Sequence, residues 1–90
     1  MIKSLPDIKI VVIRMDKVPY MDQSGLFTLE DAIKDMQAQN VKVLFTDLHG
    51  QPEDLFDTYN IKPGLVAEEN FFEDFDSCMK WVGDYLRKTA

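Results

Sequence analysis

The chain has one cysteine and one histidine, and each scarcity excludes a class of protein. A single cysteine, Cys78, cannot form an internal disulfide, so a reducing compartment such as the cytosol fits the sequence. One histidine and one cysteine are also too few for a standard zinc site. We therefore predict no metal, and the residues suggest no other cofactor.

Long apolar runs and clusters of basic residues are absent as well. The longest apolar run, Ile10–Ile13, is far shorter than the roughly 20 residues of a membrane span, and Met1–Pro6 is too short and polar for a signal peptide. Sixteen acidic and ten basic side chains give a formal net charge of −6. Nucleic acids and anionic membrane surfaces both attract clustered Lys and Arg. We therefore expect an acidic cytosolic module that binds no nucleic acid.

The hydrophobic pattern predicts alternating strands and helices in one domain spanning residues 1–90. The predicted strands are Ile8–Met15, buried on both faces, Val41–Leu48, and a short Leu65–Ala67. The predicted helices are Ser24–Gln39, stopped by Asn40, Pro52–Tyr59, stopped by Asn60, and Glu73–Lys88. This alternation with short connections favours an α/β fold in which a sheet of mainly parallel strands is flanked by helices.

Ligand sites in such sheets form beyond the carboxyl ends of the strands, and polar residues gather there. The three loops in question are Asp16–Gln23, Leu48–Gln51 and Glu68–Phe71. The first two follow strands that we expect to be neighbours, so their side chains should converge. We predict a partner-binding surface, called the rim below, made of Tyr20, Asp22, Gln23, His49 and Gln51.

The most informative segment is VPYMDQSGLFTL, Val18–Leu29, where a strand loop enters a helix. Asp22 or Ser24 can cap the free backbone N–H groups of that helix, and Gly25 allows close backbone approach. A helix N-terminus also attracts an anion, or a phosphate carried on a side chain. The simpler alternative is a plain helix cap with a glycine beside it.

The pattern V-P-x-M-D-x-S-G-L-x-x-L in this segment resembles the signature loop and helix of the STAS domain. That family includes anti-sigma-factor antagonists and the C-terminal domains of SulP-type anion transporters. The flanking strands KIVVIRMDKVP and VKVLFTDL, and the tail E-x-N-x-F followed by an amphipathic helix, fall in the family's order over residues 5–86. The tail and the run Y-M-D-Q-S-G-L-x-x-L-E-D are more similar to the transporter branch.

The resemblance implies a STAS-like fold and a non-catalytic regulatory domain on the cytosolic side of a SulP-type transporter for sulfate or a related anion. Such a domain would sit in the cytoplasm as part of an inner- or plasma-membrane protein. Its partner would be the membrane portion of the same transporter or a cytosolic regulatory protein. The alternative is a free-standing, antagonist-like protein that switches partners.

Two features depart from the family pattern. The antagonists are phosphorylated on the Ser or Thr directly after the aspartate, and here that position is Gln23, with Ser24 next. We therefore predict that Ser24 caps the helix and is not a phosphoacceptor.

STAS domains usually begin with further strands before the one at Ile8, whereas Met1–Asp7 is all that precedes it here. This predicts a partial STAS domain, whether trimmed, a fragment or a reduced variant, that forms a homodimer through its uncovered sheet edge.

Other candidate sites have plainer explanations. His49 could join Asp22 and Ser24 in part of a Ser-His-Asp set, but no oxyanion glycine series accompanies them, so we predict no enzyme and a polar turn residue. The acidic tail lacks the spacing of a calcium loop and is predicted to be solvated. In the last helix, Phe75, Trp81 and Tyr85 are predicted to be core and Cys78 to be a small buried hydrophobe, and Phe71–Phe72 are predicted to anchor that helix. The apolar stripe of this helix consists of Phe75, Cys78, Met79, Val82, Tyr85 and Leu86.

Overall fold

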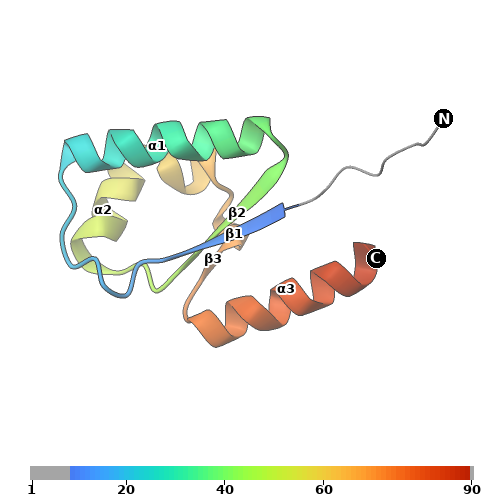
Figure 1. Cartoon of the computed structure of the whole chain (residues 1–90). Helices are drawn as coiled ribbons and strands as arrows, with labels where there is room; N and C mark the ends of the chain where they lie inside the picture. Colours follow the sequence, from blue (N-terminus) through green and yellow to red (C-terminus); the bar gives the residue numbers. More distant parts are fainter. Residues whose placement is uncertain (1–8, 90) are drawn as a thin grey trace.

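The structure is a computed structural model that describes residues 9–89 (Figure 1). The strands are β1 (Lys9–Arg14), β2 (Val41–Thr46) and β3 (Phe71–Phe72). The helices are α1 (Gln23–Ala38), α2 (Gly50–Thr58) and α3 (Phe75–Thr89), with short helical turns η1 (Ile61–Leu65) and η2 (Glu68–Asn70) before β3. The predicted α/β class is confirmed. The prediction that strands are missing before Ile8 concerns residues outside the described range.

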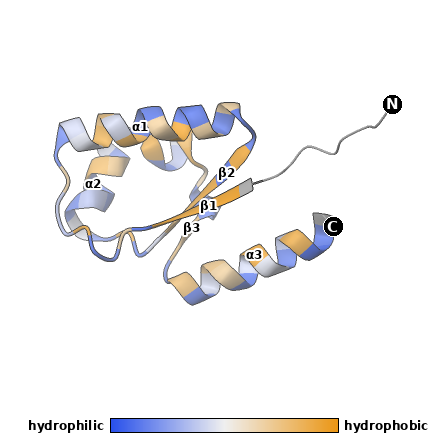
Figure 2. Cartoon of the chain, viewed as in Figure 1, coloured by the Kyte–Doolittle hydropathy of each residue, from blue (hydrophilic) through white to orange (hydrophobic). Residues whose placement is uncertain are grey.

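The described strands form one parallel sheet in the order β1-β2-β3. Lys9 lies opposite Val41 and Arg14 opposite Thr46, so β1 and β2 pair over their whole length. Helices α1 and α2 cover one face of the sheet and α3 covers the other, and the strands between them are the most hydrophobic segments (Figures 1 and 2). All three strands therefore end at the same edge, which carries the loops predicted to form the rim.

Alternation along β2 divides the core between the two faces of the sheet. Val43 and Phe45 pack with residues of α1 and α2, whereas Leu44 packs with Cys78 and Val82 of α3. Because a strand alternates its side chains, a central strand with helices on both faces is apolar throughout, and Val43–Thr46 is indeed fully buried. In β1 the apolar residues are only half-buried, contrary to the prediction, because among the described strands it pairs with β2 alone.

Helix α1 forms where the periodicity predicted it. Leu26 and Ile33 are fully buried on one face, and Leu29 packs against the same cluster. Asn40, which follows the C-cap of α1, has a left-handed φ of 63°, and Asn60, which follows the C-cap of α2, has a φ of 56°. Asparagine tolerates this conformation because its side chain can bond locally, so both predicted stops are confirmed.

The third strand lies later than predicted. Val66, within the predicted strand Leu65–Ala67, is buried, but its N–H donates to the carbonyl oxygen of Ile61 at 2.8 Å and closes a helical turn. The ladder with β2 is made by Phe71–Phe72. The reason is aromatic packing: Phe71 stacks on Phe45 with ring centroids 5.1 Å apart, whereas Phe72 reaches Trp81 at 6.0 Å on the other face. The predicted loop Glu68–Phe71 is therefore not the end of a strand, and only one phenylalanine of the pair contacts α3.

The starts of two helices also differ from prediction. Helix α2 begins at Gly50, so Pro52 is inside the first turn and buried. Helix α3 begins at Phe75, and the Asp74 carboxylate accepts the N–H of Ser77 at 2.7 Å, which caps it.

Cys78 of α3 is buried as predicted, but Met79 and Leu86 are 42% and 47% exposed. The predicted apolar stripe is therefore only partly buried, because the apolar arc of α3 is wider than the face that the sheet covers. No helix among the described residues is long and apolar enough to cross a membrane.

Candidate functional site

Gln51 joins the two loops of the rim. Its Oε1 accepts the backbone N–H of Met21 at 2.8 Å, and its Nε2 donates to the carbonyl oxygen of Met21 at 2.8 Å. The loop after β1 is thereby fastened to the first turn of α2, so the predicted convergence of these loops is present. Because both ends of the amide are used inside the chain, the geometry gives Gln51 a positioning role.

Asp22 is the N-cap of α1. Its Oδ1 accepts the N–H of Gly25 at 2.7 Å, and its backbone is extended, with φ −94° and ψ 173°. A Cβ added to Gly25 would lie 3.1 Å from that oxygen, so the glycine leaves room for the cap. Ser24 lies inside the helix and is exposed, with its carbonyl oxygen accepting the hydroxyl of Thr28 at 3.0 Å. The prediction that Ser24 caps the helix was therefore wrong, and the alternative, Asp22, is the cap.

Gln23 ties the start of α1 to the end of α2. Its Nε2 donates a hydrogen bond to the hydroxyl oxygen of Tyr59. The Tyr59 ring also meets the ring of Phe27 edge-on, with centroids 5.5 Å apart. Neither Phe27 nor Tyr59 was predicted to belong to the rim, because a contact across 36 residues leaves no local pattern in the sequence. Among the described contacts, no hydrogen bond or ring contact fixes the Tyr20 side chain, which is 69% exposed.

His49 is not hydrogen-bonded to the serine and aspartate with which the sequence could have grouped it. It occupies the N-cap position of α2, is exposed, and makes no side-chain cap bond. Within residues 9–89, no hydrogen bond joins it to Asp22 or Ser24. The turn depends instead on Gly50, whose φ of +64° suits a residue without a Cβ.

Two titratable groups near the start of α3 have shifted pKa values. Hydrogen bonds from the backbone N–H and then the side chain of Ser77 lower the pKa of Asp74, and burial raises the pKa of the Cys78 thiol. Within the described part of the chain, no group of three or more His, Cys, Asp or Glu side chains is placed to hold a metal. The rim itself presents polar and aromatic side chains, among them the exposed Tyr20 and His49.

Comparison with protein families identifies the fold. The model of the STAS domain matches residues 3–78, which include the whole rim and all three strands. The chain belongs to the STAS domain family. No curated protein matches the chain. STAS domains are generally non-enzymatic regulatory modules, so membership indicates a regulatory role like that of the anti-sigma-factor antagonists. The match ends at Cys78, and most of α3 therefore lies beyond it.

Proposed function

We propose that this STAS domain is the cytosolic regulatory module of a SulP-type transporter for sulfate or a related anion. It acts by binding the membrane portion of that transporter, or a cytosolic regulatory protein, through the rim. The observation that carries the proposal is Gln23. It follows the capping Asp22, where the antagonists carry a phosphorylated hydroxyl, and its amide is bonded to Tyr59. An antagonist-type phosphorylation switch has no acceptor at that position.

The tail gives separate support through its resemblance to the transporter branch. Its E-x-N-x-F residues form η2 and β3, in which Phe72 lies opposite Thr46 and contacts Trp81. The motif therefore sets where α3 docks on the sheet. A tail that fixes this helix, together with a loop lacking the phosphoacceptor, fits a domain that works by standing contacts.

The rim has the physical character of a preformed binding surface. Gln51 and Gln23 fasten its loops on two sides, so little ordering entropy is lost when a partner binds. Tyr20 projects from it with 69% exposure, and Tyr is enriched at protein interfaces because its ring buries area while its hydroxyl can bond.

The test uses the complete reading frame that encodes this chain. We expect that frame to encode membrane spans upstream and that Tyr20→Arg lowers anion uptake at equal expression, because a bulky cation replaces the exposed ring. Lys34→Glu is the matched control, since it lies on α1 away from the rim and its bond partner Glu30 is also a surface residue. Gln23→Arg should lose uptake too, but it also breaks the bond to Tyr59, so Tyr20→Arg decides.

Two results would overturn the proposal. Equal loss from Tyr20→Arg and Lys34→Glu would place the functional surface elsewhere. A frame without membrane spans, together with stoichiometric phosphorylation of the exposed Ser24 by a cognate kinase, would replace it with the free-standing antagonist.

A further inference from the structure

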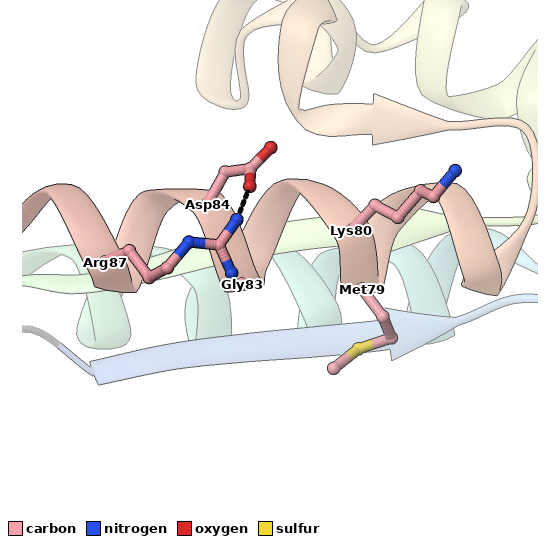
Figure 3. Close-up of a pocket in the computed structure, with 5 residues that line it drawn as sticks. All are labelled: Met79, Lys80, Gly83, Asp84 and Arg87. Carbon is pink, nitrogen blue, oxygen red and sulfur yellow. Dashed lines mark hydrogen bonds and ion pairs between the residues drawn. The ribbon is translucent and has the colours of Figure 1, made fainter.

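The outward face of α3 is a surface that the rim does not use. An open hollow of about 500 Å³ runs along it, lined by Met79, Lys80, Gly83, Asp84 and Arg87, all from this one helix (Figure 3). Met79 is 42% exposed, and Leu86, one helical turn beyond Gly83, is 47% exposed. The face therefore has an apolar side and a charged side with a glycine between them.

Gly83 has no explanation within the chain itself. Glycine in the middle of a helix lowers its stability relative to alanine. A Cβ added at Gly83 would meet Arg87 Nη1 at 3.8 Å, which is ordinary contact, and no positive φ requires a glycine there. A glycine on an exposed helix face does permit another backbone to come close. The position is therefore suited to a helix that crosses α3 at Gly83.

We propose that this helix is α3 of a second copy of the chain, packed antiparallel about a two-fold axis at Gly83. With a rise of about 1.5 Å per residue, Lys80 lies about 4.5 Å before Gly83 and Asp84 about 1.5 Å after it. The two-fold rotation reverses the direction of the helix. It brings the charged side of one copy against the charged side of the other, and the apolar side against the apolar side. Lys80 then comes within about 3 Å, along the axis, of Asp84 of the second copy.

The apolar side matches itself under the same rotation. Met79 lies about 6 Å before Gly83 and Leu86 about 4.5 Å after it, so Met79 meets Leu86 of the second copy. On the charged side, two cations lie between two carboxylates along the axis. The cations are Lys80 of the first copy and Arg87 of the second, and the carboxylates are Asp76 of the first copy and Asp84 of the second. A two-fold interface is self-complementary, so a second copy matches the apolar side and the charged side at once. An unrelated partner would need its own apolar and charged residues in the same arrangement.

Charge also favours this face over the rest of the molecule. The chain has a formal net charge of −6, so two copies repel one another over most approaches. The outward face of α3 carries the carboxylates of Asp76 and Asp84 and the cations Lys80 and Arg87, of which Arg87 already donates to the Asp84 carboxylate within the same helix, so the face is electrically balanced. A single helix crossing buries less than the roughly 1,200 Å² of a standard interface, so the dimer should be weak, with a dissociation constant of about 10–500 μM.

The homodimer predicted from the sequence used a different surface, the edge of β1. That strand has β2 as its only neighbour among the described strands, and no residue of the α3 face belongs to it. Substitutions on α3 therefore distinguish the two modes of association.

The experiment measures self-association of the whole chain by sedimentation equilibrium between about 10 μM and about 1 mM at low salt. We expect Lys80→Glu and Asp84→Lys each to raise the dissociation constant at least about tenfold, because each places like charges together across the interface. Mixing the two variants should restore a heterodimer, since in one contact the new glutamate faces the new lysine, and the other contact keeps the natural Asp84 against the natural Lys80. The control pair, Lys34→Glu and Glu30→Lys, makes the same changes in net charge on α1 and should leave association unchanged.

Gly83→Gln provides a second readout. Glutamine is a better helix former than glycine, so the monomer should become more heat-stable, while its side chain blocks the crossing and abolishes the dimer. A chain that remains monomeric at about 1 mM would overturn the proposal. Self-association that persists in Gly83→Gln, or that changes equally in the α1 controls, would also overturn it and would assign the dimer to another surface.

Discussion

Replacing Thr46 with valine is expected to stabilise the domain. Thr46 is the last residue of β2, is 0% exposed, and its Oγ1 has no hydrogen-bond partner among the described residues. By strand alternation it shares the face of Leu44, which packs against Cys78 of α3. The hydroxyl is therefore enclosed in an apolar layer near the carboxyl ends of the strands.

The magnitude follows from what the substitution removes and retains. A buried polar group without a partner costs about 1–3 kcal/mol, and valine has nearly the same shape, so no cavity and no crowding are created. Both residues are β-branched and suit a strand equally, so the backbone preference changes little. We expect a gain of about 1–2 kcal/mol in the free energy of unfolding, which is about 5–15 °C in Tm for a domain of this size.

The assay is urea and thermal unfolding followed by the fluorescence of Trp81, the chain's single tryptophan, at low protein concentration so that association does not contribute. Thr28→Val is the matched control, because the Thr28 hydroxyl is exposed and bonds the carbonyl oxygen of Ser24. Its effect should stay within about 0.5 kcal/mol. If Thr46→Val proved less stable than the natural chain, the hydroxyl would have a partner in solution and the reasoning would be refuted.

The sequence was sufficient to predict those elements that local patterns encode. Strand β2 was found because its apolar residues around Val43–Phe45 are typical of a strand buried between helices, and α1 because Leu26 and Ile33 recur on one face. The helix stops at Asn40 and Asn60 were predicted correctly because asparagine is one of the few non-glycine residues that readily adopt a left-handed conformation. These are short-range effects, and a single sequence contains them in full.

The third strand was missed because its position depends on contacts far along the chain. Phe71 and Phe72 carry no strand-length pattern of their own, and they pair with β2 because one ring fits each face of the sheet. The segment around Val66 has the apolar composition of a strand but closes a turn onto Ile61. Tertiary packing therefore overrode local propensity here.

At the candidate site, the sequence predicted which polar residues gather, but not what each of them does. The polar residues of the rim do lie on loops and helix starts that meet, but the sequence could not show that Gln51 is bonded to Met21 and Gln23 to Tyr59. The choice between Asp22 and Ser24 as the cap depended on where the first turn begins, and a shift of one or two residues decides it.

Three further predictions address caps and turns. Asp22→Ala should lower the free energy of unfolding by about 1 kcal/mol, whereas Ser24→Ala should change it by less than about 0.5 kcal/mol, and equal losses in urea unfolding would contradict the assignment of the cap. Gly50→Ala should cost about 1–2 kcal/mol by the same assay, because a Cβ there has open space around it but strains a φ of +64°, and an unchanged urea midpoint would contradict this. Asp74→Asn should flatten the acid side of the pH–stability curve. The hydrogen bonds from Ser77 lower the pKa of Asp74 from its ordinary value of 3.8. The folded state therefore favours the ionised form, and this contribution is fully present above the unfolded pKa and is lost as the pH falls through the lower folded pKa. The natural chain should lose more stability than the variant between about pH 5 and about pH 2.5. The asparagine side chain can still accept the N–H of Ser77, so the helix cap is present in both proteins. Urea midpoints measured across that range test the prediction, and parallel acid limbs for the two proteins would show that the Asp74 carboxylate contributes nothing to folding as a charge.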